Sequence, residues 1–254
     1  MPRPRKPTTP RLKARSQTKD SRYLLKGSGS TASSFRIPTF DFTKPLGTSL
    51  DGPQKEFPME VLERGKLQMD SGNYEKAKLI LEEALVESRK AWGDGDEKTL
   101  VAMSILGILL HKMNDLEQAK ELYVEALAGY RKSFGDTHPD TLACINNLGL
   151  LEKKMGDLEA AELLYEEALA GSREALGEAH PDTLQSIKNL AALLYSMGQF
   201  AEALPLFRES LAGRRAQLGS GHVSTKNSAV GVFNTLTQLG DKKGAAAVRA
   251  EFEF

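Results

Sequence analysis

The sequence repeats every 42 residues from Met59 onward, without insertion or deletion. A fixed period of this length is typical of stacked arrays, in which each unit buries its apolar face against its neighbours. It therefore predicts an array over residues 58–254 rather than a core closed on itself. The units begin at Met59, Val101, Ala143, Gln185 and Asn227, and the fifth is cut short at Phe254.

Small and large side chains occupy fixed columns of this repeat. A glycine or alanine facing an alanine lets two helix backbones approach closely, and a large side chain fills the space beside them. The columns are Gly65, Gly107, Gly149 and Ala191; Ala77, Ala119, Ala161, Ala203 and Ala245; Leu81, Tyr123, Tyr165 and Phe207; and Ala84, Ala126, Ala168 and Ser210.

Each unit predicts two helices joined by a turn. In the third unit Leu148, Leu151 and Met155 share one helical face, and apolar residues within 161–169 form a second face after a Gly-Asp turn. Gly177 follows the second helix, where it is expected to be a left-handed C-terminal cap.

Two short motifs link these units to a known family. Residues 135–142 read Gly-Asp-Thr-His-Pro-Asp-Thr-Leu, and residues 146–149 read Asn-Asn-Leu-Gly. With the columns, they resemble the tetratricopeptide repeat of the kinesin light chain kind, over residues 59–254. The resemblance implies an all-α fold: an α-solenoid, coiled as a right-handed superhelix, of about five helix-turn-helix units. It also implies a non-catalytic adaptor or assembly scaffold for protein partners.

The segment before the repeats differs in charge and composition. Residues 1–57 hold twelve Lys/Arg and four acids, a net charge of +8, so residues 58–254 carry −8 and the whole chain is neutral. This arm is rich in Pro, Ser and Thr and is expected to be disordered or extended. A solvated tail, an arm that binds acids or phosphates, a nuclear signal and an organelle transit peptide remain alternatives. Its leading basic residues are Arg3, Arg5, Lys6, Arg11, Lys13 and Arg15.

A groove is predicted on the first helix of each pair, which the family resemblance places on the concave face. Most of the charged residues opposite the packing stripe are basic: they are Lys66, Lys112, Lys153, Lys154 and Lys188, against Asp70. We expect them to bind an extended peptide, acidic or bearing a carboxylate, although solvated lysines on helices would give the same pattern. The predicted groove residues are Ser104, His111, Lys112, Asn146, Asn147, Lys153, Lys154, Lys188, Asn189 and Tyr195.

No catalytic, cofactor or metal motif is found. His138, His180 and His222 share one column, which indicates one repeated structural role, and successive units hold them too far apart for one metal ion. Cys144 is expected to be a small core residue. The alternative function is a component of a complex that contains nucleic acid, or of an organellar complex, anchored through the arm. A cytoplasmic protein is expected, with the nucleus or an organelle as alternatives.

Two further features are structural expectations. One arginine column lies near the end of each second helix, where positive charge favours the helix dipole. Residues 242–254 predict a short last helix whose Phe252 and Phe254 are candidates for docking on a partner, a second copy or the arm. The arginines of the column are Arg89, Arg131, Arg173 and Arg215.

Overall fold

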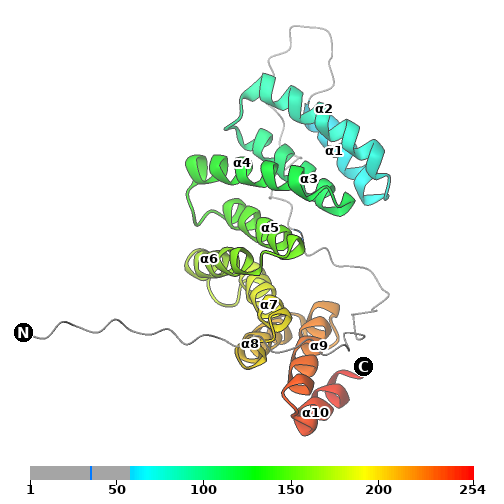
Figure 1. The fold of residues 1–254 in the computed structure, drawn as a ribbon, viewed down its shortest axis with the longest axis vertical. Coiled ribbons are helices and arrows are strands. Elements are labelled where there is room, and N and C mark those ends of the chain that lie inside the picture. The colour runs from blue at the N-terminus through cyan, green and yellow to red at the C-terminus, as the bar shows by residue number, and fades with distance from the viewer. Residues whose placement is uncertain (1–34, 36–57) are drawn as a thin grey trace, which may run out of the picture. The chain divides into compact units, whose positions relative to one another are not determined.

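The computed structural model describes residue 35 and residues 58–254. Within this part of the chain there are ten helices and no strand, as Figure 1 shows, so the predicted all-α array is confirmed. The helices are α1 (Pro58–Asp70), α2 (Tyr74–Trp92), α3 (Glu97–Met113), α4 (Leu116–Phe134), α5 (Pro139–Met155), α6 (Leu158–Leu176), α7 (Pro181–Ser196), α8 (Phe200–Leu218), α9 (Val223–Gln238) and α10 (Lys242–Phe252).

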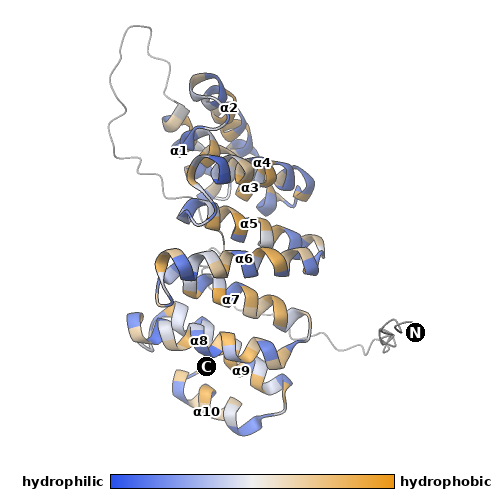
Figure 2. Ribbon diagram, turned by 90° about the vertical axis from the view of Figure 1, so that its left-hand side faces the viewer, coloured by the Kyte–Doolittle hydropathy of each residue, from blue (hydrophilic) through white to orange (hydrophobic). Residues whose placement is uncertain are grey.

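The helices stack in chain order as five pairs. Each helix packs against the next one along the chain, and the first helices of successive pairs also contact each other. Figure 2 shows polar and apolar residues side by side on the same helices, as expected for helices that bury only one face. The arm, with its basic residues Arg3, Arg5, Lys6, Arg11, Lys13 and Arg15, lies outside the described residues apart from Phe35.

A loop that recurs along the array connects each helix pair to the next, and we call it the joint. Its residues explain the His-Pro-Asp-Thr motif. His180 caps α7, because its Nδ1 accepts a hydrogen bond from the backbone N–H of Asp182 at 3.2 Å. Pro181 follows at the first helical position, where no backbone N–H is needed. The hydroxyl of Thr183 donates to the carbonyl of Gly177 at 2.7 Å and closes the loop. The same capping bond forms at Asp96, His138 and His222.

The glycine of this joint differs from the prediction in one respect. Gly177 has the positive φ expected of it, 83°, but its ψ of 166° places it outside the left-handed helical region. This combination is essentially restricted to glycine, because a Cβ atom would clash with the backbone. Gly156, between α5 and α6, has φ 93° and ψ 2° and is the true left-handed cap of the third unit.

Packing inside each pair follows the predicted columns. A Cβ atom added to Gly149 would lie 2.8 Å from the ring of Tyr165, so the missing side chain is what admits the tyrosine. The ring of Tyr165 is buried, as are Leu148 and Leu151. Met155 departs from the predicted inward stripe, since it is 37% exposed at the end of α5.

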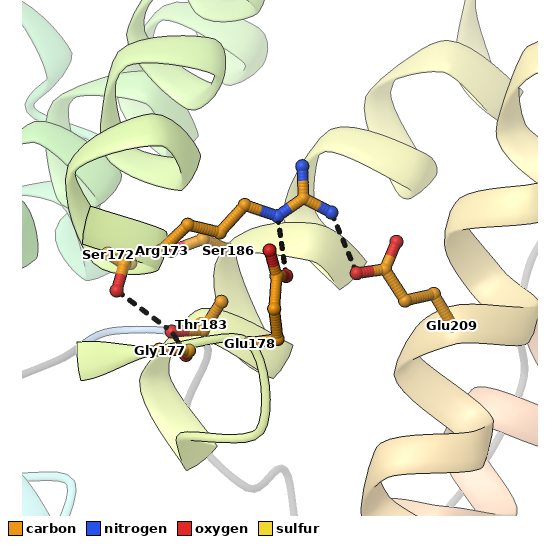
Figure 3. A network of polar contacts seen from close by, with 7 residues as sticks. All are labelled: Ser172, Arg173, Gly177, Glu178, Thr183, Ser186 and Glu209. Atoms are coloured by element: carbon orange, nitrogen blue, oxygen red, sulfur yellow. Dashed lines mark hydrogen bonds and ion pairs between the residues drawn. The ribbon is translucent and has the colours of Figure 1, made fainter. Parts of the chain in front are cut away.

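The arginine column also joins neighbouring pairs, which the helix dipole alone did not predict. Figure 3 shows Arg173 at the end of α6 between two carboxylates. Its Nη2 donates to Glu209 of α8 at 2.7 Å, and its Nε donates to Glu178 of the joint at 2.8 Å. Equivalent pairs between second helices are Arg89–Glu125, Arg131–Glu167 and Arg215–Glu251. We call these four pairs the arginine ladder.

The last pair is closed by aromatic residues. Phe252 of α10 is buried, and Phe254 packs edge-to-face on Phe233 of α9 with ring centroids 5.6 Å apart. Arg249 donates from Nε to the carbonyl oxygen of Phe254 at 2.8 Å. These contacts hold both candidate docking residues against their own repeat.

Candidate functional site

The predicted groove residues of the third and fourth units are brought together by bonds between α5 and α7. Asn189 of α7 donates from Nδ2 to Oδ1 of Asn146 at 3.1 Å, and Asn146 donates to the hydroxyl of Ser186 at 3.0 Å. Lys153 of α5 donates to the carbonyl of Ala192 at 3.1 Å. These bonds join α5 to α7, and we call the surface that carries Asn146, Lys153, Lys154, Lys188 and Asn189 the α5–α7 face.

This face is organised by a chain of hydrogen bonds that ends on a buried arginine. Arg214 of α8 donates from Nη2 to Oε1 of Gln185 at 2.8 Å, and Gln185 donates to Oδ1 of Asn189 at 2.8 Å. Asn146 spends both N–H bonds of its amide on Leu142 and Ser186, whereas one N–H on each of Gln185 and Asn189 has no acceptor among the described residues. The amides free to bind a ligand are therefore Gln185 and Asn189, held in place by Asn146.

The cations of the face have no acid partner in the part of the chain that the structure describes. Within residues 58–254, no carboxylate lies within ion-pair distance of Lys153, Lys188 or Arg214. Burial lowers the pKa of Lys153 and of Arg214, and burial together with the charge of Arg214 lowers the pKa of Lys188. The positive charges of the partly buried Lys188 and the buried Arg214 thus repel each other, and an anion bound beside them would relieve this repulsion.

A pocket opens beside the amides of this face, where the third unit has a small side chain. Tyr130 and Arg214 occupy one column of the repeat in the second and fourth units, and both are buried. The third unit has Ser172 in that column, which leaves a space between the N-terminal ends of α5 and α7. The pocket is lined by Pro139, Leu142, Ala143, Asn146, Ser172, Leu176, Asp182, Gln185 and Asn189.

The remaining predicted residues lie at the margins of this face or beneath it. Ser104 and Asn147 are fully buried, and the Ser104 hydroxyl donates to the carbonyl of Leu100 within α3. Lys112 is partly exposed on α3, and Tyr195 packs edge-to-face on Phe200 at 5.2 Å.

His111 of α3 is also a predicted groove residue, and it is almost completely buried. Its side chain is 7% exposed, and Lys154 of α5 donates from Nζ to its backbone carbonyl at 2.9 Å. Burial, and to a smaller extent the charge of Lys154, lower the pKa of His111 to about 4. The imidazole is therefore neutral at pH 7.

Sequence reasoning did not single out Arg214, Gln185 or Ser172. Arg214 and Gln185 depart from their columns, in which Tyr130 and Ala143 hold matching positions of other units, whereas Ser172 repeats Ser88 of the first unit. A search for broken columns, in place of constant ones, would have found the buried arginine.

Comparison with known families identifies the repeat. Residues 59–132, 106–174 and 164–216 match the family model described as tetratricopeptide repeat. The chain belongs to the tetratricopeptide repeat family. No curated protein sequence matches it.

Solved structures of tetratricopeptide repeats share the fold at low sequence identity. A putative kinesin light chain from Podosopora anserina with nearly identical TPR-like repeats is 22% identical, with a TM-score of 0.69, over 79% of this chain and 96% of that one. BtubC (BKLC) from P. vanneervenii is also 22% identical with a TM-score of 0.69, over 76% and 77% of the two chains. A Rap protein in complex with Competence and Sporulation Factor is 14% identical, with a TM-score of 0.62, over 77% and 54%. The predicted resemblance to repeats of the kinesin light chain kind is confirmed at the level of the fold.

The histidine column and the cysteine of the described tetratricopeptide repeats have structural roles. His138, His180 and His222 cap helices, which is the repeated structural role that their shared column predicts. Cys144 is fully buried in the core. Among residues 35 and 58–254, no group of three metal-ligating side chains occurs, and none of the helices has the length and apolar character needed to cross a membrane.

Proposed function

We propose that the chain is a non-catalytic adaptor or assembly scaffold that binds an extended, acidic peptide on the α5–α7 face. The observation that carries the proposal is the pair formed by Lys188 and Arg214, two neighbouring cations without a carboxylate among the described residues. A carboxylate of the ligand would supply the missing charge, and charge-assisted hydrogen bonds are about twice as strong as neutral ones.

The rest of the face supports the same class of ligand. Among the described residues, Gln185 and Asn189 each keep an N–H without an acceptor that can donate to a peptide carbonyl, and both line the pocket. The family is typically a non-catalytic scaffold for protein partners. Lys153 and Lys154 extend the positive charge along α5, so an acidic segment longer than one residue would be attracted along the face.

Selection from a random dodecapeptide display library tests this proposal on the full chain. We expect the selected peptides to be enriched in Asp and Glu, and to bind with an affinity that falls as salt is added. In the Lys188→Glu variant their affinity should fall at least tenfold, and in Lys188→Gln by an intermediate factor.

The variants have a built-in safeguard and a matched control. Lys188→Glu places a carboxylate near Arg214, so it should not weaken the fold, and circular dichroism can verify this. Lys132→Glu changes the same charge at an exposed site on α4 and should leave binding unchanged. Peptides without acidic residues, or equal binding by wild type and Lys188→Glu, would refute the proposal.

A further inference from the structure

The groove surface formed by the first helices of the pairs is more buried in the first two units than in the third and fourth. In α5 and α7, all groove residues that point away from the packing stripe are at least partly exposed. They lie between Asn146 and Lys154 and between Lys188 and Ser196. In the same columns of α1 and α3, several residues are almost completely buried. These are Leu62, Met69, Ile108 and His111, with 0, 2, 1 and 7% of their surface exposed.

Phe35 is the described residue from outside the array that lies on this covered part. Its ring meets the imidazole of His111 edge-to-face, with centroids 4.6 Å apart and an angle of 82° between the planes. Phe35 is itself half-buried and packs against the apolar cluster to which Leu62, Met69 and Ile108 belong. Edge-to-face contact is a favoured geometry for aromatic rings, because the positive edge of one ring points at the negative face of the other.

The chain between Phe35 and α1 is long enough for the Phe35 ring to reach His111, and the covalent link favours this contact. Residues 36–57 join Phe35 to α1, and an extended chain of that length reaches about 70 Å at 3.3 Å per residue, so reach is not limiting. A tethered group is present at an effective concentration in the millimolar range, which lets a small contact surface stay occupied.

We propose that Phe35 is an internal ligand of the array. Its ring fills a site beside His111 on α3, and an external ligand of that part of the face has to displace it. The ligand class of this His111 site is an aromatic side chain, because the site offers an apolar surface and a neutral imidazole, and no acidic group of the described residues acts on that imidazole. The proposal concerns α1 and α3 and does not depend on the peptide proposed for the α5–α7 face.

His111 provides a direct readout of occupancy. Its pKa is lowered to about 4 by burial and by Lys154 of α5, which is the charged side chain that acts on it. When the covering ring is removed, water reaches the imidazole and the pKa should rise toward the ordinary value of 6.5, staying below it because Lys154 remains.

Nuclear magnetic resonance of the full chain measures both the contact and its consequence. In the wild type we expect a nuclear Overhauser effect between the Phe35 ring and the His111 imidazole. In Phe35→Ala this effect disappears and the pKa of His111 rises. Circular dichroism verifies that the variant is folded.

A second aromatic residue serves as the matched control. Phe254→Ala removes a ring of the same size from the Phe233 pair at the other end of the array and should leave the titration of His111 unchanged. An identical His111 titration in wild type and Phe35→Ala, or no Overhauser effect between the two rings in the wild type, would overturn the proposal.

Discussion

At the scale of single residues, the joint between pairs shows why one motif recurs. The histidine of the motif acts through the acceptor lone pair of Nδ1, so any short side chain with an acceptor could take its place. The chain contains that alternative, because Asp96 caps α3 through Oδ1 with a bond of 2.9 Å to the backbone N–H of Lys98.

Replacing the cap tests this role in the fourth pair. His180→Ala should lower the free energy of unfolding by about 1 kcal/mol, since one backbone N–H of α7 loses its partner. His180→Asp restores an acceptor and adds a negative charge at the helix N-terminus, so it should be at least as stable as the wild type. Urea unfolding followed by circular dichroism measures both changes. Equal losses in the two variants would contradict the capping role.

The sequence predicted candidate residues only as far as helical spacing allows. Lys153, Lys188 and Asn189 were chosen because this spacing places them on, or next to, the face opposite the packing stripe of the first helices. The contribution of Arg214 could not be predicted, since it comes from a second helix and reaches the face through a space between two units. That space depends on side-chain packing across the joint, which helical periodicity does not describe.

At the scale of helices, the arginine ladder shows how neighbouring second helices are kept in register. Both of its columns are constant in sequence, with arginine at 89, 131, 173 and 215 and glutamate at 125, 167, 209 and 251. The repeated arginines and glutamates could therefore be found in the sequence, but the ion pairs between them could not be predicted. Residues 36 positions apart meet only because the second helices stack side by side, a fact of tertiary structure.

A double-mutant cycle measures one rung of the ladder. Arg173 and Glu209 are 36 and 37% exposed, so solvent screens their attraction and the coupling energy should be positive but no more than about 1 kcal/mol. Free energies of unfolding of Arg173→Ala, Glu209→Ala and the double variant give this value. It should shrink in 0.5 M salt. A coupling energy indistinguishable from zero at low salt would mean that Arg173 and Glu209 lie close together without stabilising the fold.

At the scale of the whole array, the predicted fold class, helix number per unit and turn positions were all confirmed, because each follows from local pattern. Stability of a repeat array is a sum of unit terms and interface terms, so interior units are the last to open. Cys144 lies in such a unit, fully buried, with its thiol 3.6 Å from the carbonyl of Tyr123.

The reactivity of this thiol reports how far the array opens. Burial raises the pKa of Cys144 to about 12, so both access and thiolate are lacking in the native state near pH 8. We expect labelling by Ellman's reagent to be limited by unfolding and to accelerate with urea. Ala170→Cys adds a thiol at an exposed site on α6, where it should react at once. Equally fast labelling of Cys144 in the wild type would show that the third unit opens locally.

The uniformity of the joints has a consequence for how such a chain can change length. Successive pairs are held by the same charged rung, capping bond and glycine, each at a constant separation along the sequence. Duplication or loss of one 42-residue segment would therefore recreate every junction, whereas a segment one residue longer would rotate the following helices by about 100°. The molecule can grow or shrink by whole repeats at almost any point, while Arg214, which occurs once in its column, stays the mark of one position.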